Sequence, residues 1–149
     1  MSARPTINEM MEAYAADAVE HAQSAFGLKL DYSAESIKDV EDVLSKLHRS
    51  FPRGLMRLIR RPPSAETIDT LCKMYGGYIG EVYRRTVGGT WDLREDIPGA
   101  EGPMLALSRP GGDAIFPPAK VWKRIHNGAE DDVWFYFQVF TKQADGDAA

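Results

Sequence analysis

Apolar residues recur at helical spacing in three long stretches of the chain. Residues 5–26, 36–49 and 65–87 each place them three or four positions apart, which is the period of an amphipathic helix. Gly27 is a natural stop for the first stretch, and Ser64 is a candidate N-cap for the third. We therefore predict three helices before residue 88.

Other segments alternate apolar and polar side chains, the pattern of a half-buried strand. Residues 28–32 do so between the first two helices. Residues 90–94, 104–107 and 114–116 follow the third helix and are separated by glycine- and proline-containing turns. We predict that these last three form a small antiparallel meander.

Two further segments complete the pattern. Pro117 and Pro118 open a predicted short helix that Gly128 closes. Residues 133–140 are ambiguous, because their aromatic and β-branched content is typical of a strand while the acidic residues before them suit a helix N-terminus. We favour the helix.

Together these elements predict an α+β fold in which N-terminal helices pack on a small antiparallel sheet and a C-terminal helix follows. The length of 149 residues suits one domain, 1–149, with frayed ends at 1–4 and 143–149. The composition, 44% hydrophobic and 27% charged, is that of an ordinary globular chain.

Composition also narrows the location and the partners. The lone Cys72 excludes an intramolecular disulfide, and residues 1–23 lack the apolar run of a signal peptide, so we expect a cytoplasmic protein. No stretch of about 18 apolar residues is present, which argues against a membrane span. The net charge of −4 argues against nucleic-acid binding and suits a basic protein partner.

Three glycines interrupt the third helix. Gly76, Gly77 and Gly80 each cost about 1 kcal/mol relative to alanine in a helix interior, so a compensating contact is expected. Gly76 and Gly80 share a helix face that admits close approach of a backbone or ligand. This face is either a tight helix–helix contact, the floor of a binding groove, or the interface of a homodimer.

The candidate binding residues surround these glycines. Glu81 and Arg85 are four residues apart, as in a surface ion pair. Alternatively they face a groove together with Trp91 and Asp92 and orient a polar ligand or a side chain of a partner. The candidates are Tyr78, Glu81, Arg85, Trp91 and Asp92.

No catalytic motif or metal-ligand spacing appears, and we expect no cofactor. His21, His48 and His126 are widely separated, and Cys72 lies on the apolar stripe of its helix. A basic cluster is either a solvated face or a site for phosphate or an acidic protein. It comprises Arg53, Arg57, Arg60 and Arg61.

Several motifs resemble a family of bacterial domains of unknown function over about residues 30–142. They are the G-x-Y-[IL]-G-E-V helix at 76–82, the Gly-Gly-x-Trp step at 88–91, the V-x-K-R segment at 121–124 and the acidic cap before residue 133. The resemblance implies an α+β fold, a bacterial source and a helix for residues 131–142. It implies no activity.

These observations lead to a non-enzymatic, protein-binding domain as the first hypothesis. A narrower version is an immunity or antitoxin-like protein, because a small acidic domain suits a basic toxin. The alternative is a small-molecule-binding protein or enzyme with a pocket between the glycine-rich helix and the sheet.

Overall fold

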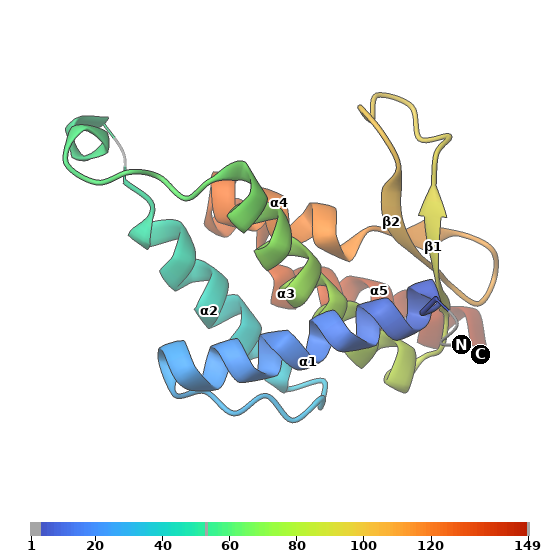
Figure 1. Ribbon diagram of the computed structural model, residues 1–149. Helices are drawn as coiled ribbons and strands as arrows, with labels where there is room; N and C mark the ends of the chain where they lie inside the picture. The colour runs from blue at the N-terminus through green and yellow to red at the C-terminus, as the bar shows by residue number, and fades with distance from the viewer. Residues whose placement is uncertain (1–3, 53, 149) are drawn as a thin grey trace.

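Five α-helices and a three-stranded antiparallel sheet form the part of the chain that the computed structural model describes (Figure 1). That part comprises residues 4–52 and 54–148, without the side chains of 143–148. The α-helices are α1 (Ile7–Phe26), α2 (Ser36–Ser50), α3 (Ala65–Thr86), α4 (Pro117–Asn127) and α5 (Val133–Ala148), with short 3-10 helices η1 (Gly54–Leu58) and η2 (Ala129–Asp131). The α+β prediction is confirmed.

Local capping explains where the predicted helices begin and end. The Thr6 hydroxyl accepts a hydrogen bond from the Glu9 amide at 3.1 Å at the start of α1, and Gly27 ends that helix with a φ of 66°. Ser64 accepts from the Thr67 amide at 3.1 Å at the start of α3. Side-chain oxygens thus satisfy backbone amides that have no partner within the helix.

Residues 133–140 belong to helix α5, as predicted. The amide of Phe135 donates to the Asp132 carboxylate at 2.8 Å, and the amide of Val133 donates to Glu41 of α2 at 3.1 Å. Val133 and Phe137 are both buried and lie four residues apart, on one face of the helix. The ends predicted to fray, 1–4 and 143–149, fall partly outside the described residues, which exclude 1–3, 149 and the side chains of 143–148; the backbone of 143–148 continues α5.

The strand predicted at residues 28–32 is wrong. These residues form an irregular segment that pairs with none of the three strands of the sheet. Leu30 is buried, its polar neighbours Lys29 and Asp31 are exposed, and Tyr32 has a φ of 63°. The alternation of apolar and polar side chains at residues 28–32 therefore reflects the half-burial of a segment that connects α1 and α2.

The sheet consists of β1 (Thr90–Arg94), β2 (Met104–Ser108) and β3 (Ala114–Ile115) in the order β1-β2-β3. β1 pairs with β2 in the register that places Trp91 opposite Leu107. The sheet lies against α1 and α4, and its β1–β2 hairpin projects from the helical body (Figure 1). This is the predicted meander.

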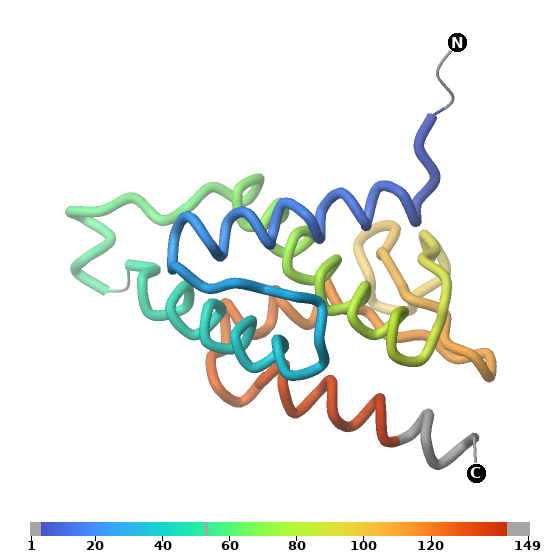
Figure 2. Tube along the Cα trace, turned by 90° about the horizontal axis from the view of Figure 1, so that it is seen from below, coloured from blue at the N-terminus to red at the C-terminus, as the bar shows by residue number. Residues whose placement is uncertain are grey.

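Helix α3 is central to the packing. It packs along α1 on one side and against α4 on another, while α2 packs against α4 and α5. Seen from below, α1 and α5 form opposite sides of the molecule (Figure 2). The core is therefore built around a helix that has neighbours on several faces and buries most of its second half.

Candidate functional site

The three glycines of α3 lie in contacts within the chain. A β-carbon at Gly76 would meet the backbone of Pro118 in α4, and one at Gly80 would overlap the indole of Trp91. Gly77 lies against Met11 of α1, with 3.1 Å between its β-carbon position and the Met11 carbonyl oxygen. These contacts offset the low helix propensity of glycine. They also occupy the Gly76/Gly80 face within the chain, which argues against a homodimer built on that face.

Tyr78 lies in the core. Its hydroxyl accepts a hydrogen bond from the Tyr32 amide at 2.8 Å and shares a second one with the Ser36 hydroxyl at 2.6 Å. Burial raises the pKa of this phenol. Tyr78 therefore anchors the irregular segment before α2 and offers no atom to a ligand.

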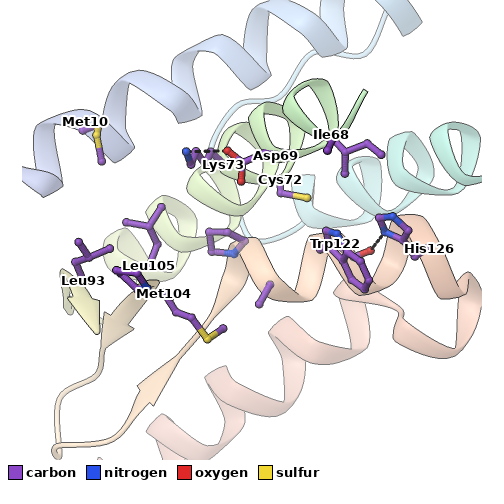
Figure 3. A pocket seen from close by; sticks show the side chains of 14 residues that line it. Met10, Ile68, Asp69, Cys72, Lys73, Leu93, Met104, Leu105, Trp122 and His126 are labelled. Carbon is purple, nitrogen blue, oxygen red and sulfur yellow. Dashed lines mark hydrogen bonds and ion pairs between the residues drawn. The ribbon is translucent and has the colours of Figure 1, made fainter. Parts of the chain in front are cut away.

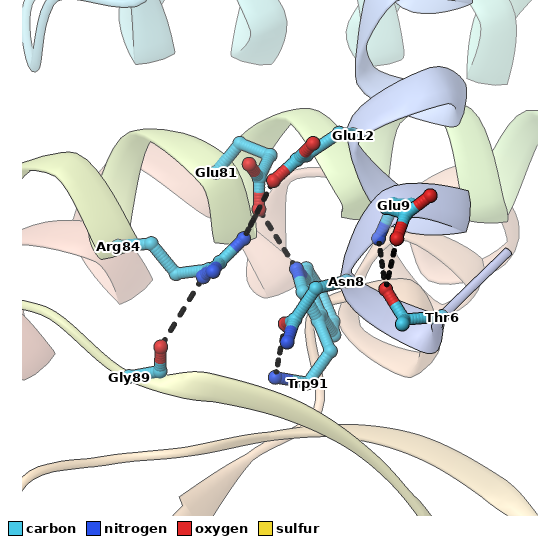
Figure 4. Close-up of polar contacts among 8 residues, drawn as sticks. All are labelled: Thr6, Asn8, Glu9, Glu12, Glu81, Arg84, Gly89 and Trp91. Carbon is cyan, nitrogen blue, oxygen red and sulfur yellow. Dashed lines mark hydrogen bonds and ion pairs between the residues drawn. The ribbon is translucent and has the colours of Figure 1, made fainter.

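Glu81 and Trp91 form a buried polar contact (Figure 4). The indole Nε1 of Trp91 donates to Glu81 at 2.8 Å, and Nη1 of Arg84 donates to the same carboxylate oxygen at 2.9 Å. The Trp91 amide donates to Asn8 of α1 at 3.0 Å, and Nε of Arg84 donates to the Gly89 carbonyl at 3.2 Å. The network joins α1, α3 and β1.

Arg85 and Asp92 are exposed. Arg85 lines a polar pocket together with Glu81, Arg84 and Gly89 of that network, whereas Asp92 is not part of this pocket. The predicted Glu81–Arg85 pair is wrong, because Arg84 takes the place beside Glu81 and the Arg85 guanidinium lies 3.7 Å from the centre of the Tyr32 ring. Asp92 lies 3.3 Å from Arg94 of its own strand. The five candidate residues therefore form no common exposed face.

A groove does lie between the glycine-rich helix and the sheet, but different residues line it (Figure 3). Its volume is about 810 Å³, and α1, α3, α4 and the β1–β2 hairpin all contribute. Most of the lining is apolar. The main apolar contributors are Met10, Ile68, Leu93, Met104, Leu105 and Trp122.

Few polar groups reach this groove, and those are engaged with one another. Asp69 and Lys73 form an ion pair at 2.8 Å. The His126 ring stacks on Trp122, with 3.8 Å between ring centres, and its Nδ1 lies 2.7 Å from the Trp122 carbonyl oxygen. Burial raises the pKa of the Cys72 thiol to about 12. Cys72 is thus protonated at neutral pH.

The β1–β2 hairpin, which supplies Leu93 and Met104 to the groove, is acidic. Its residues 92–101 include four exposed carboxylates and one arginine, Arg94. Glu66 adds a further exposed carboxylate beside Ala65, which lines the groove at the start of α3. The hairpin carboxylates are Asp92, Glu95, Asp96 and Glu101.

An arm, defined here as residues 54–61, projects beyond the ends of α2 and α3 (Figure 1). Leu55, Leu58 and Ile59 are 81%, 84% and 80% exposed, and Arg57, Arg60 and Arg61 are also exposed. Arg53 of the predicted basic cluster lies outside the described residues. The arm therefore presents apolar and basic side chains together.

Sequence reasoning missed both the groove lining and the apolar side of the arm. Met104 and Leu105 look like ordinary strand residues, and Trp122 looks like a core residue although it is 49% exposed. A signal for the arm was present, because apolar residues 55, 56, 58 and 59 stand between proline-containing segments without a helix long enough to bury them.

The described part of the chain has no group of three or more histidine, cysteine or carboxylate side chains arranged to hold a metal ion. Among the helices described, none has the length and hydropathy needed to cross a bilayer. In the comparisons with known proteins, no family model, curated protein or solved structure matches this chain.

Proposed function

We propose that this protein is a non-enzymatic binding module that holds an apolar, basic segment of another polypeptide in the groove between α3, α4 and the β1–β2 hairpin. One observation carries the proposal: an open groove lined mostly by apolar side chains lies beside a hairpin that carries four exposed carboxylates. Apolar side chains of the segment would fill the groove, and its lysines or arginines would face the hairpin carboxylates.

The groove has the chemistry of an interface centre. Trp122 is aromatic and Met104 is long and flexible, and both types of side chain are enriched in protein interfaces. Trp122 is half-exposed and stacked on His126, so it offers a preformed aromatic surface. Residues of this kind supply most of the binding energy at interfaces.

The polar groups of the groove support binding more than catalysis. The Cys72 thiol has a pKa of about 12 because it is buried, which disfavours a nucleophilic thiolate. Asp69 is paired with Lys73. An immunity protein that neutralises a basic toxin would be a specific case of the binding module proposed here.

Selection of random peptides displayed on phage against the full chain tests the proposal. Enriched peptides should combine apolar residues with lysine or arginine. Trp122→Ala and Met104→Glu should weaken their binding about tenfold or more, because both remove apolar surface from the groove. Phe135→Ala, a change at an exposed α5 residue outside the groove, is the control and should leave affinity unchanged.

Enrichment of acidic peptides, or peptide binding that ignores Trp122 and Met104, would contradict the proposal. A second candidate is a small apolar ligand, favoured by a groove volume of about 810 Å³, which falls in the range of small-molecule sites. A library of apolar small molecules, tested for their effect on thermal stability, separates the two candidates. Compounds that stabilise the wild type but not Met104→Glu would favour the small-ligand site.

A further inference from the structure

The exposed apolar side chains of the arm need a partner. Leu55, Leu58 and Ile59 are each at least 80% exposed and are separated by only a few residues. Isolated apolar side chains on a surface are common, but a contiguous group marks a contact site. Arg57 and Arg60 lie among them, so the arm suits an apolar surface with a negative rim.

The rest of the same chain has the complementary charge. The arm contains three arginines and no acidic residue, so removing its charge from the net −4 leaves −7 on the remainder. Part of that negative charge lies on two elements that contribute to the groove, at Glu95 and Asp96 of the β1–β2 hairpin and at Asp69 of α3, which pairs with Lys73. The arm is thus apolar like the lining of the groove and opposite in charge to the hairpin that contributes to it.

The arm lies outside the groove of its own chain, although Gly54 and Arg57 line a neighbouring pocket that shares Ala65, Ile68 and His126 with the groove. Three residues, 62–64, join it to Ala65 at the edge of the groove, and two of them are prolines. Proline fixes its own φ and holds the preceding residue extended, which opposes a tight reversal. Figure 1 accordingly shows the arm pointing away from the body.

We infer that the arm of one copy docks in the groove of a second copy, and that the exchange is reciprocal in a twofold dimer. This inference rests on the proposed function, since it identifies a polypeptide segment that the groove binds. Leu58 and Ile59 enter the groove beside Met104 and Trp122, and the arm arginines face the hairpin. A twofold arrangement uses both arms and both grooves and leaves none open.

A charge-swap experiment on the full chain tests this arrangement. Variant one carries Arg57→Glu and Arg60→Glu on the arm, and variant two carries Asp69→Lys and Glu95→Lys at the groove. All four side chains are exposed, so folding should persist. In sedimentation equilibrium, wild type should form dimers, and each variant alone should dissociate about tenfold or more readily because like charges meet.

An equimolar mixture of the two variants should dimerise again. In the mixed pair, each glutamate-bearing arm meets a lysine-bearing groove, and each arginine-bearing arm meets an acidic groove. The matched control is Lys38→Glu with Glu35→Lys, which reverses the exposed ion pair between Lys38 of α2 and Glu35, the N-cap residue of that helix. This control should leave dimerisation unchanged. Dimerisation of the mixture supports reciprocal docking.

A wild type that stays monomeric at millimolar concentration, or a mixture that does not associate, overturns the inference. So does co-sedimentation of monomeric wild type with phosphatidylglycerol vesicles that is lost on Leu58→Asp, because the arm would then bind lipid. The proposed function is tested separately by peptide selection on variant one, whose groove is intact. If variant one binds peptides through the groove while the wild type is monomeric, only the self-docking is rejected and the proposed function stands.

Discussion

The indole of Trp91 lies against the backbone at Gly80, in the space that a β-carbon would occupy. From that position its Nε1 reaches the buried carboxylate of Glu81. A glycine in the middle of a helix and a tryptophan at the start of the sheet thus make one contact that fixes β1 against α3.

Gly80→Ala should destabilise the protein. The methyl group would overlap the rigid Trp91 ring, and overpacking costs about 1–3 kcal/mol, which outweighs the gain of about 1 kcal/mol in helix propensity. Urea unfolding followed by circular dichroism measures the change. Gly102→Ala, where no atom lies within 4 Å, is the control. Equal stability of Gly80→Ala and wild type would contradict this packing.

Glu41→Ala should be among the most destabilising single changes. The Arg124 guanidinium is buried and donates to Glu41 at 2.8 Å from both Nε and Nη2. Removing the carboxylate leaves a buried charge unpaired, which costs about 3–5 kcal/mol. Glu35→Ala removes an exposed pair with Lys38 and should cost at most about 1 kcal/mol. Chemical denaturation of both variants provides the comparison.

Stability should fall as the solution is acidified, in part through His21. Burial lowers the pKa of His21 below its usual 6.5, so the unfolded chain binds a proton that the folded chain resists. This contribution is fully present above pH 6.5 and is lost as the pH falls through the lower folded-state pKa. His21→Gln should therefore reduce the loss of unfolding free energy between pH 7 and acidic pH, whereas His126→Gln, at an exposed position, should not.

Cys72 should react slowly with thiol reagents in the folded protein. With the pKa raised from 9.0 to about 12, its thiolate fraction at pH 8 falls by about a thousandfold. The rate of modification by an uncharged maleimide should be low in buffer and should rise steeply in urea. Rapid labelling of the native chain would show that Cys72 is less buried than the groove geometry implies.

Much of the helical structure was predictable because its signals are local. Gly27 adopts the left-handed conformation that ends α1, and Ser64 and Asp132 accept hydrogen bonds from nearby amides. Residues 28–32 misled the prediction, because alternation reports half-burial and does not tell whether a neighbouring strand is present to pair.

The site was less predictable because side-chain type does not reveal which direction a residue faces. Tyr78 and Glu81 carry the groups expected of a binding surface, yet both are engaged inside the core. Ser36 of α2 forms a hydrogen bond with Tyr78, and Trp91 of β1 donates one to Glu81. Arg84 and Arg85 are chemically identical, and only the rotation of α3 selects the first as the partner of Glu81.

The helices, the meander, the close contacts required at the glycines and the charge of the arm could be predicted from the chain alone, because each follows from local geometry or composition. The folded structure was needed to show that Trp91 covers Gly80, that Glu81 is buried and that an apolar groove opens beside α3. Those outcomes depend on how α4 and the hairpin pack on α3, and such packing between distant segments leaves no local pattern in the chain.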